Sequence, residues 1–152
     1  MDPDRALSVR SGPWSPAEIR AFLDDAAIPI RLATAGSYPM VQSLWFLRED
    51  DALWCATQST AVVARRLSAD DRCGFEVAAD APPYRGVRGT GRATLDAAEA
   101  RRILPLLIAK YLGPEPTALT ARLLAGLDNE VAIRIDHVCV STWDYTARMT
   151  SS

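Results

Sequence analysis

The chain has 152 residues, 49% of them hydrophobic and 24% charged, with a net charge of −2 and a pI near 5.4. This length and composition predict one soluble globular domain spanning residues 1–152, and the acidic balance excludes electrostatic attraction to nucleic acid. No apolar run reaches the ~20 residues of a membrane span, and the first residues lack the apolar core of a signal peptide, so we expect a cytoplasmic protein with no membrane or nucleic-acid partner.

The first element predicted is a helix that begins after Ser15. Ser15 suits the N-cap, Pro16 the first helical position, and Glu18 the last position of a capping box. We expect this helix to run to about Ala27, preceded by a flexible N-terminal arm of residues 1–14. Three strands with tight polar turns between them come next: Ile28–Ala35, Met40–Arg48 and Leu53–Thr57.

The second half of the chain alternates helical and strand patterns. We expect a short helix at about Thr60–Ser68, strands at Cys73–Ala79 and Arg85–Leu95, a helix after Asp96, a short helix capped by Thr117, and a closing strand or hairpin that begins at Val131 and ends at Trp143. Pro105 must kink the long helix or begin a second one. Three strands joined by tight turns exclude a doubly wound parallel sheet, and the pattern predicts a mainly β, α+β protein built on a small antiparallel barrel.

The strands carry apolar residues on both faces. Trp45 and Phe46 are adjacent and therefore point to opposite sides, and Trp54 adds a second tryptophan on the next strand. One face fills the barrel, and the other must be covered by helices, a cofactor or a second subunit. We favour a symmetric dimer as the covering, because a twofold pair is the commonest soluble assembly.

The strand Arg85–Leu95 reads RGVRGTGRATL and separates two faces. Val87 and Ala93 point one way with the glycines, while Arg88, Thr90 and Arg92 point the other way. Glycines within a strand mark bends, bulges or close approach of another backbone. We favour a coiled barrel strand with a solvated arginine face over a phosphate-binding strand.

The cysteines and the histidine give little support for side-chain catalysis. Cys55, Cys73 and Cys139 are odd in number, widely spaced and set in apolar strands, which is typical of buried free thiols. His137 is the sole histidine, so no metal site and no hydrolytic triad are predicted.

The segment Ala52–Arg72 is the place where the sequence hints at chemistry. A strand, a polar corner and a helix start in succession can hold an anionic cofactor. Four other segments accompany it: the strands PMVQSLWFLRED, CGFEVAAD and YRGVRGTGRATL and the ending RIDHVCVSTWDYTARM. Taken in chain order, the five segments resemble the flavin-binding split-barrel proteins related to pyridoxamine 5′-phosphate oxidase. The resemblance covers more than half of the chain.

The resemblance implies a homodimer of six-stranded antiparallel split barrels with flanking helices and a cofactor groove between the subunits. The second strand would contact the cofactor through Gln42, Ser43, Leu44 and Trp45, and the corner through Thr57, Gln58, Ser59 and Val63. Trp143 would come from the partner subunit and cover part of the ring. No residue is expected to be an obligatory acid or base.

The chain departs from the family where the cofactor phosphate is held. The usual lysine, serine and arginine positions on the short helix are Ala61, Val62 and Val63, and the oxidase's other cations fall at Val41 and Phe46. The basic residues that could compensate are Arg65, Arg66 and Arg88. For Arg65 and Arg66 the alternatives are solvation, or pairing with Asp70 and Asp71.

The resemblance therefore implies an FMN-dependent oxidoreductase acting on a small molecule. The alternatives are a reductase using the deazaflavin coenzyme F-420, a non-catalytic flavin- or haem-binding protein for storage or sensing, and a structural dimer with an empty groove.

Overall fold

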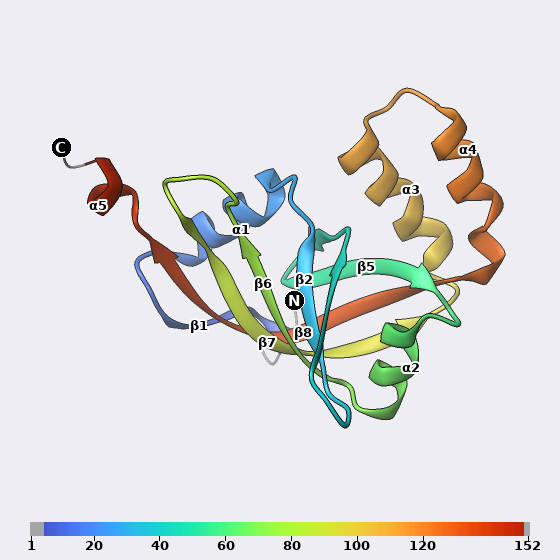
Figure 1. The fold of residues 1–152 in the computed structure, drawn as a ribbon, viewed down its shortest axis with the longest axis horizontal. Helices are drawn as coiled ribbons and strands as arrows, with labels where there is room; N and C mark the ends of the chain where they lie inside the picture. Colours follow the sequence, from blue (N-terminus) through green and yellow to red (C-terminus); the bar gives the residue numbers. More distant parts are fainter. Residues whose placement is uncertain (1–4, 151–152) are drawn as a thin grey trace.

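The computed structural model describes residues 5–150 (Figure 1). Its strands are β1 (Ser8–Ser11), β2 (Ile30–Thr34), β3 (Met40–Leu44), β4 (Leu47–Glu49), β5 (Ala52–Gln58), β6 (Arg72–Ala78), β7 (Arg85–Asp96) and β8 (Glu130–Asp144). Its helices are α1 (Pro16–Asp25), α2 (Val62–Ala69), α3 (Ala100–Leu112), α4 (Ala118–Ala125) and α5 (Thr146–Thr150), with a 3₁₀ turn, η2, at Leu127–Asn129.

All strands belong to one curled sheet with the order β3-β2-β6-β7-β8-β5-β4. Neighbours along this path are antiparallel, while β1 pairs with β8 in parallel. The long strands β7 and β8 cross the whole molecule and carry the other strands on either side (Figure 1). The predicted antiparallel α+β split-barrel fold with flanking helices is confirmed, with eight strands in residues 5–150 where six were expected.

The N-terminal segment contributes a strand that the sequence does not predict. Ser8 and Val9 of β1 lie opposite Cys139 and Val140 of β8, and the Leu7 N–H donates to the Asp51 carboxylate at 3.0 Å. Residues 1–4 of the expected arm lie outside the described residues.

The predicted strand Met40–Arg48 is two strands, because the ladder breaks between Leu44 and Leu47. The Phe46 N–H donates to the Tyr111 hydroxyl at 3.2 Å, and the Phe46 carbonyl accepts from Lys110 Nζ at 3.0 Å. These two α3 side chains satisfy backbone groups that a continuous strand would have paired. β3 therefore pairs with β2, and β4 pairs with β5.

The inner face of the sheet holds the main core. Ile19 and Leu23 of α1 and Val63 and Leu67 of α2 pack into it, and Phe46 is completely buried there. Burying a side chain of this size contributes about 1.5–3 kcal/mol. The inner face is thus filled by two helices, one at each end of the half-barrel.

Part of the outer face is covered by α3, which corrects the expectation that a second subunit covers the tryptophans. Trp54 and Ala132 pack against Ile103 and Leu107, with Trp45 at the edge of the same cluster. The helix continues through Pro105, so no second helix begins there. Its buried apolar side chains hold it in place, and Pro105 itself faces outward.

Local sequence signals explain the helix starts. Ser15 and Glu18 form the predicted capping box of α1, and Thr117 caps α4 by accepting from the Thr120 N–H. Asp96 accepts from the Ala98 and Glu99 N–H groups and caps the turn before α3. Among the described helices none has the length and apolarity needed to cross a membrane.

The glycine strand behaves as predicted. Val87 and Ala93 are buried, whereas Arg88, Thr90 and Arg92 are exposed. A Cβ at Gly89 would lie 2.5 Å from the Cys139 carbonyl oxygen, so close backbone approach requires glycine there. The β7–β8 register also shifts between Thr90 and Arg92, which marks a bulge.

Candidate functional site

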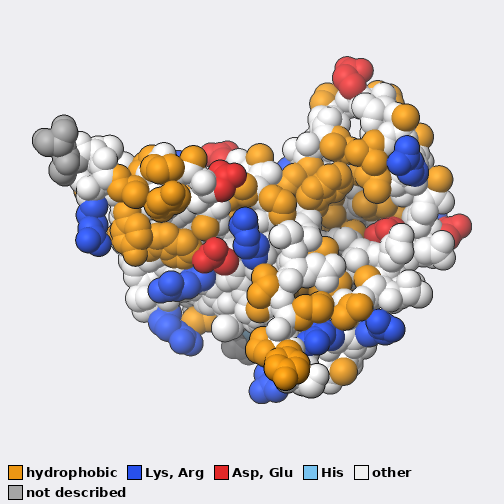
Figure 2. Space-filling view, in the orientation of Figure 1, with side chains coloured by type: hydrophobic (Ala, Val, Ile, Leu, Met, Phe, Trp, Pro, Cys, Tyr) orange, Lys and Arg blue, Asp and Glu red, His pale blue; other side chains and the backbone are white. Residues whose placement is uncertain are grey.

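A groove of about 340 Å³ lies between the strands β3 and β5 and the α3–α4 pair. Figure 2 shows hydrophobic side chains gathered in the hollow between these helices and the strands. The lining residues come from five elements: Ser43, Leu44, Trp45, Ala56, Thr57, Gln58, Leu104, Leu107, Leu123 and Glu130.

Five of the predicted contact residues meet in this groove. Ser43, Leu44 and Trp45 stand at the end of β3, where the strand breaks, and Thr57 and Gln58 stand at the end of β5. Gln42 lies earlier on β3 opposite Leu32, and Ser59 lies beyond β5; neither lines the groove. The structure therefore assembles the strand and corner residues that the resemblance implied, except for these two and Val63.

Trp45 is held against α3. Its ring stacks on Tyr111 with centroids 5.1 Å apart and planes 5° apart. The Tyr111 hydroxyl donates to the Ile28 carbonyl at 3.1 Å, and burial raises the pKa of this phenol. Burial likewise lowers the pKa of Lys110, whose ammonium lies 4.0 Å from the centroid of the Phe46 ring. The groove wall is thus fixed by hydrogen bonds and stacking rather than by free side chains.

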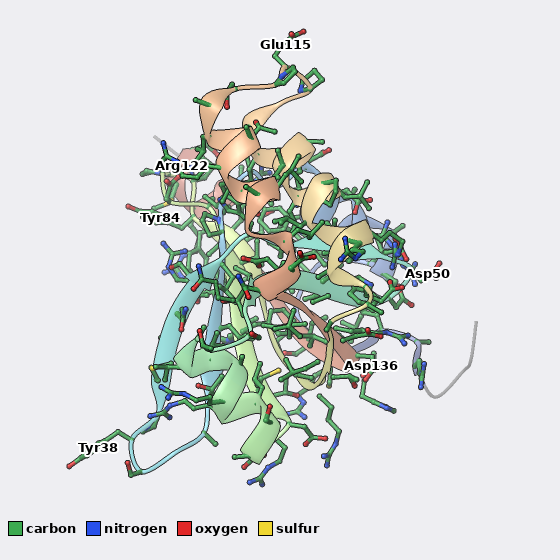
Figure 3. The ribbon with its side chains drawn as sticks, turned by 90° about the vertical axis from the view of Figure 1, so that its right-hand side faces the viewer. Tyr38, Asp50, Tyr84, Glu115, Arg122 and Asp136 are labelled. Carbon is green, nitrogen blue, oxygen red and sulfur yellow. The ribbon has the colours of Figure 1, made fainter. Side chains whose placement is uncertain are left out.

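The short helix α2 offers the groove little positive charge. Val63 is completely buried in the inner core, which corrects its assignment as a cofactor contact. Arg65 is exposed, and Arg66 Nη1 donates to the carbonyls of Ala35 at 3.1 Å and Tyr38 at 2.8 Å. Arg66 therefore ties α2 to the β2–β3 turn, whose Tyr38 points outward at the tip in Figure 3.

The alternative pairing of the α2 arginines is also not formed. Asp70 pairs with Arg72 at 2.7 Å, and Asp71 pairs with Arg92 at 2.8 Å. The pKa of Asp70 is lowered to about 2, chiefly by the hydrogen bond from Arg72. Each aspartate is thus neutralised by an arginine of the sheet.

Arg88 and Trp143 lie together in another part of the molecule. The Arg88 guanidinium carbon is 5.4 Å from the Trp143 ring centroid, on the adjoining strands β7 and β8. Neither lines the groove of the same chain. The structure therefore separates these two predicted contacts from the other five.

Glu130, the first residue of β8, was missed by the sequence reasoning. It is the one charged residue among the groove lining, and burial raises the pKa of its carboxyl. The predicted closing strand begins one residue later, at Val131, which puts Glu130 in the preceding loop. The spacing of Leu104 and Leu107 is typical of the apolar face of a helix, but nothing in the sequence indicates that Leu123 lines the same groove.

The groove fits a flat ring but not a phosphate. Its walls are formed by Leu44, Trp45, Leu104, Leu107 and Leu123, and charge-assisted hydrogen bonds to a phosphate would require a cation that the lining lacks. The expected phosphate positions are Ala61, the 44%-exposed Val62 and the buried Val63. The groove of a single chain therefore offers apolar walls but no cation for a phosphate among its lining residues.

The thiols and the histidine stand apart from the groove. Cys55 and Cys73 are buried as predicted, and burial raises the pKa of the Cys73 thiol to about 12, so neither is a reactive thiolate at neutral pH. His137 is exposed and has a φ of 52° beside the β7–β8 bulge. Within residues 5–150, no three His, Cys, Asp or Glu side chains lie together as metal ligands.

The rest of the outer face is uncovered. We define the open face as the outward residues of β2, β6, β7 and the second half of β8. Small residues cross it in register as Ala33, Gly74, Thr90 and Cys139, beside a second row of Arg31, Glu76, Arg88 and Ser141. A shallow hollow of about 580 Å³ includes Ala33, Gly74 and Thr90.

Comparison with known proteins identifies the fold. No family model matches the chain, and neither does any curated protein. Among solved structures, the conserved hypothetical protein Rv2991 from Mycobacterium tuberculosis matches with 23% identity and a TM-score of 0.77, over 92% of this chain and 91% of that one.

Two further structures extend the comparison. A protein named F-420 reductase matches with 20% identity and a TM-score of 0.65, over 80% of this chain and 94% of that one. A candidate pyridoxamine 5′-phosphate oxidase from Listeria innocua matches with 17% identity and a TM-score of 0.60, over 78% and 90% of the two chains. The predicted likeness to split-barrel proteins of this group is confirmed at the level of the fold.

Proposed function

We propose that the protein is a flavin-type oxidoreductase that holds the ring system of FMN in the groove, with the deazaflavin F-420 as the alternative cofactor. The observation that carries this proposal is the meeting of Ser43, Leu44, Trp45, Thr57 and Gln58 on one apolar groove. The fold shared with a protein named F-420 reductase supports it.

The proposed assembly is a homodimer formed through the open face. The row of Ala33, Gly74, Thr90 and Cys139 allows another sheet to approach closely, and the neighbouring row alternates in charge as Arg31, Glu76 and Arg88. A twofold copy can set Glu76 against an arginine of the other chain. Tyr38 and Val41, 81% and 66% exposed on the β2–β3 hairpin, extend this face with apolar area.

A second copy would also supply what the groove lacks. Arg88 and Trp143 lie together on β7 and β8, away from their own groove. In the proposed dimer this pair faces the groove of the other chain, where Arg88 meets the cofactor phosphate and Trp143 covers the ring. The flavin, when bound, supplies hydride chemistry; the leucines and Trp45 exclude water from the ring and orient it.

A non-catalytic binding protein is the second candidate function. The observation that favours it is the pair Val62 and Val63 at the usual phosphate positions. Haem is the less suitable ligand, because none of the groove-lining residues is the His, Cys, Met or Tyr that commonly binds haem iron.

The test is titration of the purified full chain with FMN, riboflavin and F-420, followed by absorbance and fluorescence. We expect a flavin or deazaflavin to bind at micromolar concentration, with FMN about tenfold or more tighter than riboflavin because Arg88 of the second chain holds the phosphate. Arg88→Gln should remove that difference, and Arg65→Gln should leave it unchanged.

Failure of FMN, riboflavin and F-420 alike to bind would overturn the proposed function. If the protein is an oxidoreductase, an electron-accepting substrate should reoxidise the bound reduced flavin faster than it reoxidises free reduced flavin. Reoxidation at the rate of the free flavin with every acceptor tested would favour the non-catalytic candidate.

A further inference from the structure

We propose that the groove takes a small aromatic ammonium compound as its substrate, with Glu130 as the residue that meets the cation and determines specificity. This inference rests on the proposed function, in which the same groove holds the cofactor ring, and it names the class of molecule that reacts beside that ring.

The position of Glu130 is fixed by its backbone. It begins β8 directly after the η2 turn and lies opposite Gln58 of β5 in the antiparallel register. The Ser59 N–H donates to the carbonyl of the preceding residue, Asn129, at 2.8 Å. Because the backbone of Glu130 is held in a paired strand end, binding a ligand orders only its side chain and not the chain that carries it.

The charge of Glu130 is uncompensated, unlike that of three other acidic side chains. Asp128 pairs with Arg101 at 2.7 Å, and Glu49 and Glu99 both pair with Arg102 at 2.6 Å. No described residue forms an ion pair or a hydrogen bond with the Glu130 carboxylate. Burial is the one cause that raises its pKa, and no charged neighbour contributes to the shift.

A partly buried carboxylate without a partner favours a ligand that brings the missing positive charge. Removing such a group from water is unfavourable unless hydrogen bonds replace the lost hydration. An ammonium group supplies both opposite charge and donors. The same carboxylate disfavours a substrate whose phosphate or carboxylate would lie beside Glu130, so the substrate class differs from pyridoxamine phosphate; the FMN phosphate lies instead at Arg88 of the second chain in the proposed dimer.

The walls of the groove require an aromatic body on the ligand. The half-buried side chains of Leu44, Trp45 and Leu123 line the groove over the buried Leu104 and Leu107, and they present apolar surface to any molecule that reaches Glu130. A flat ring buries this surface, whereas an aliphatic polyamine leaves its other charges unpaired against it. The arrangement therefore selects one ring with one cation.

The test compares tryptamine with indole-3-acetate, which share a ring and differ in the sign of charge. We expect tryptamine to bind the full chain about 10–100-fold more tightly by calorimetry, the range that a charge-assisted hydrogen bond contributes. Glu130→Gln preserves the shape and should reduce the preference to about threefold or less. The measurement is made on the protein without flavin and again with flavin bound.

Two variants serve as controls. Glu115→Gln removes a carboxylate at the exposed tip of the α3–α4 loop, away from the strands in Figure 3, and should keep the preference. Leu123→Ala shortens the apolar wall and should weaken both ligands equally. Circular dichroism verifies that each variant is folded.

Equal binding of the two compounds, binding of neither at millimolar concentration, or a preference that persists in Glu130→Gln would each overturn the inference. These outcomes are read from the protein without flavin, so they do not depend on whether a flavin binds. A preference for tryptamine without any flavin binding would support the role of Glu130 and overturn the proposed function. Flavin binding without that preference would support the proposed function and overturn the role of Glu130.

Discussion

The outer face of the curled sheet has two halves, of which one is covered by helix α3 and the other is open. In the covered half, Trp54 and Ala132 lie under Ile103 and Leu107 of α3. In the open half, Arg88, Thr90 and Arg92 of β7 are exposed beside small residues. β8 contributes to both halves, so one strand carries both covered and open residues.

The difference shows how side-chain size assigns roles within one sheet. Large apolar side chains such as Trp54 need a helix over them, because exposing them would leave a wide apolar area in water. Ala33, Gly74 and Thr90 expose little apolar surface and leave the backbone accessible to another sheet. The covered half therefore supports stability and the groove, and the open half is suited to association.

Trp54→Ala should produce the largest effect, because it removes the central side chain of the covered half. Trp54 is 7% exposed and lies with Arg102 and Arg134 near its ring, at 5.2 and 5.7 Å. We expect the free energy of unfolding to fall by about 3–5 kcal/mol in urea titrations. A loss under 1 kcal/mol would show that α3 does not depend on this contact.

Asp51→Asn should produce the second largest effect. The Asp51 carboxylate is 1% exposed, and Arg20 Nε donates to it at 2.9 Å. Because the Arg20 side chain is 37% exposed and its charge stays solvated, we expect a loss of about 1–3 kcal/mol, below the 3–5 typical of fully buried pairs. Asp71→Asn breaks the exposed pair with Arg92 in the open half and should cost at most about 1 kcal/mol.

The pH dependence of stability tests the pairing of Asp51. The hydrogen bond from Arg20 lowers the pKa of Asp51, so the folded state favours the ionised carboxyl. The stability that ionised Asp51 contributes is complete above the ordinary aspartate pKa near 3.9. It is lost as the pH falls through the lower pKa that Asp51 has in the folded state. Asp51→Asn should flatten the unfolding free energy between about pH 5 and pH 2; an unchanged acid slope would contradict the pairing.

The sequence predicts the covered half better than the open one. Capping signals at Ser15 and Thr117 and the apolar face of α3 identify the helices, because each signal is local. The break after Leu44 depends on Lys110 and Tyr111, which contact Phe46 from 64 and 65 residues away. No pattern within the strand could reveal it.

The strand residues of the candidate site could be predicted from the sequence, whereas the residues of its helical wall could not. Ser43, Trp45 and Thr57 lie on strands whose order resembles a known family, so their meeting could be expected. Glu130 and Leu123 reach the groove because α4 folds back over α3, an arrangement that depends on the tertiary packing of two helices. The sequence offers Arg66 as a cofactor cation, because helical spacing does not reveal its hydrogen bonds to the Ala35 and Tyr38 carbonyls.

Arg66→Ala tests whether the open half depends on its hairpin tie. The guanidinium satisfies the carbonyls of Ala35 and Tyr38 at an exposed site, so we expect a loss of about 1–2 kcal/mol. Hydrogen exchange should increase in the β2–β3 hairpin and remain unchanged in α3. Arg65→Ala is the matched control, since Arg65 is exposed on the same helix. Uniform acceleration of exchange would show a global effect and contradict the local tie.

Among these variants, Thr90→Glu should have the smallest effect on the folding stability of the single chain and the largest effect on dimer formation. Thr90 is exposed between Arg88 and Arg92 on the same side of β7, so a carboxylate there meets two cations and water, and the unfolding free energy should change by less than about 0.5 kcal/mol. In the proposed dimer the same carboxylate would occupy the row of small residues and be pressed between two sheets, where its size and charge oppose close approach.

Sedimentation should therefore show a monomer for Thr90→Glu at concentrations where the unmodified chain is a dimer. Thr94→Glu adds the same charge four residues along the strand, opposite Arg134 and outside the small-residue row, and should leave the dimer intact. If both variants remain dimeric, the open face is not the interface, and Arg88 and Trp143 cannot reach the groove of a second chain in the way proposed. If Thr90→Glu alone dissociates and also loses its preference for FMN over riboflavin, the open half both joins the chains and completes the phosphate site that the covered half lacks.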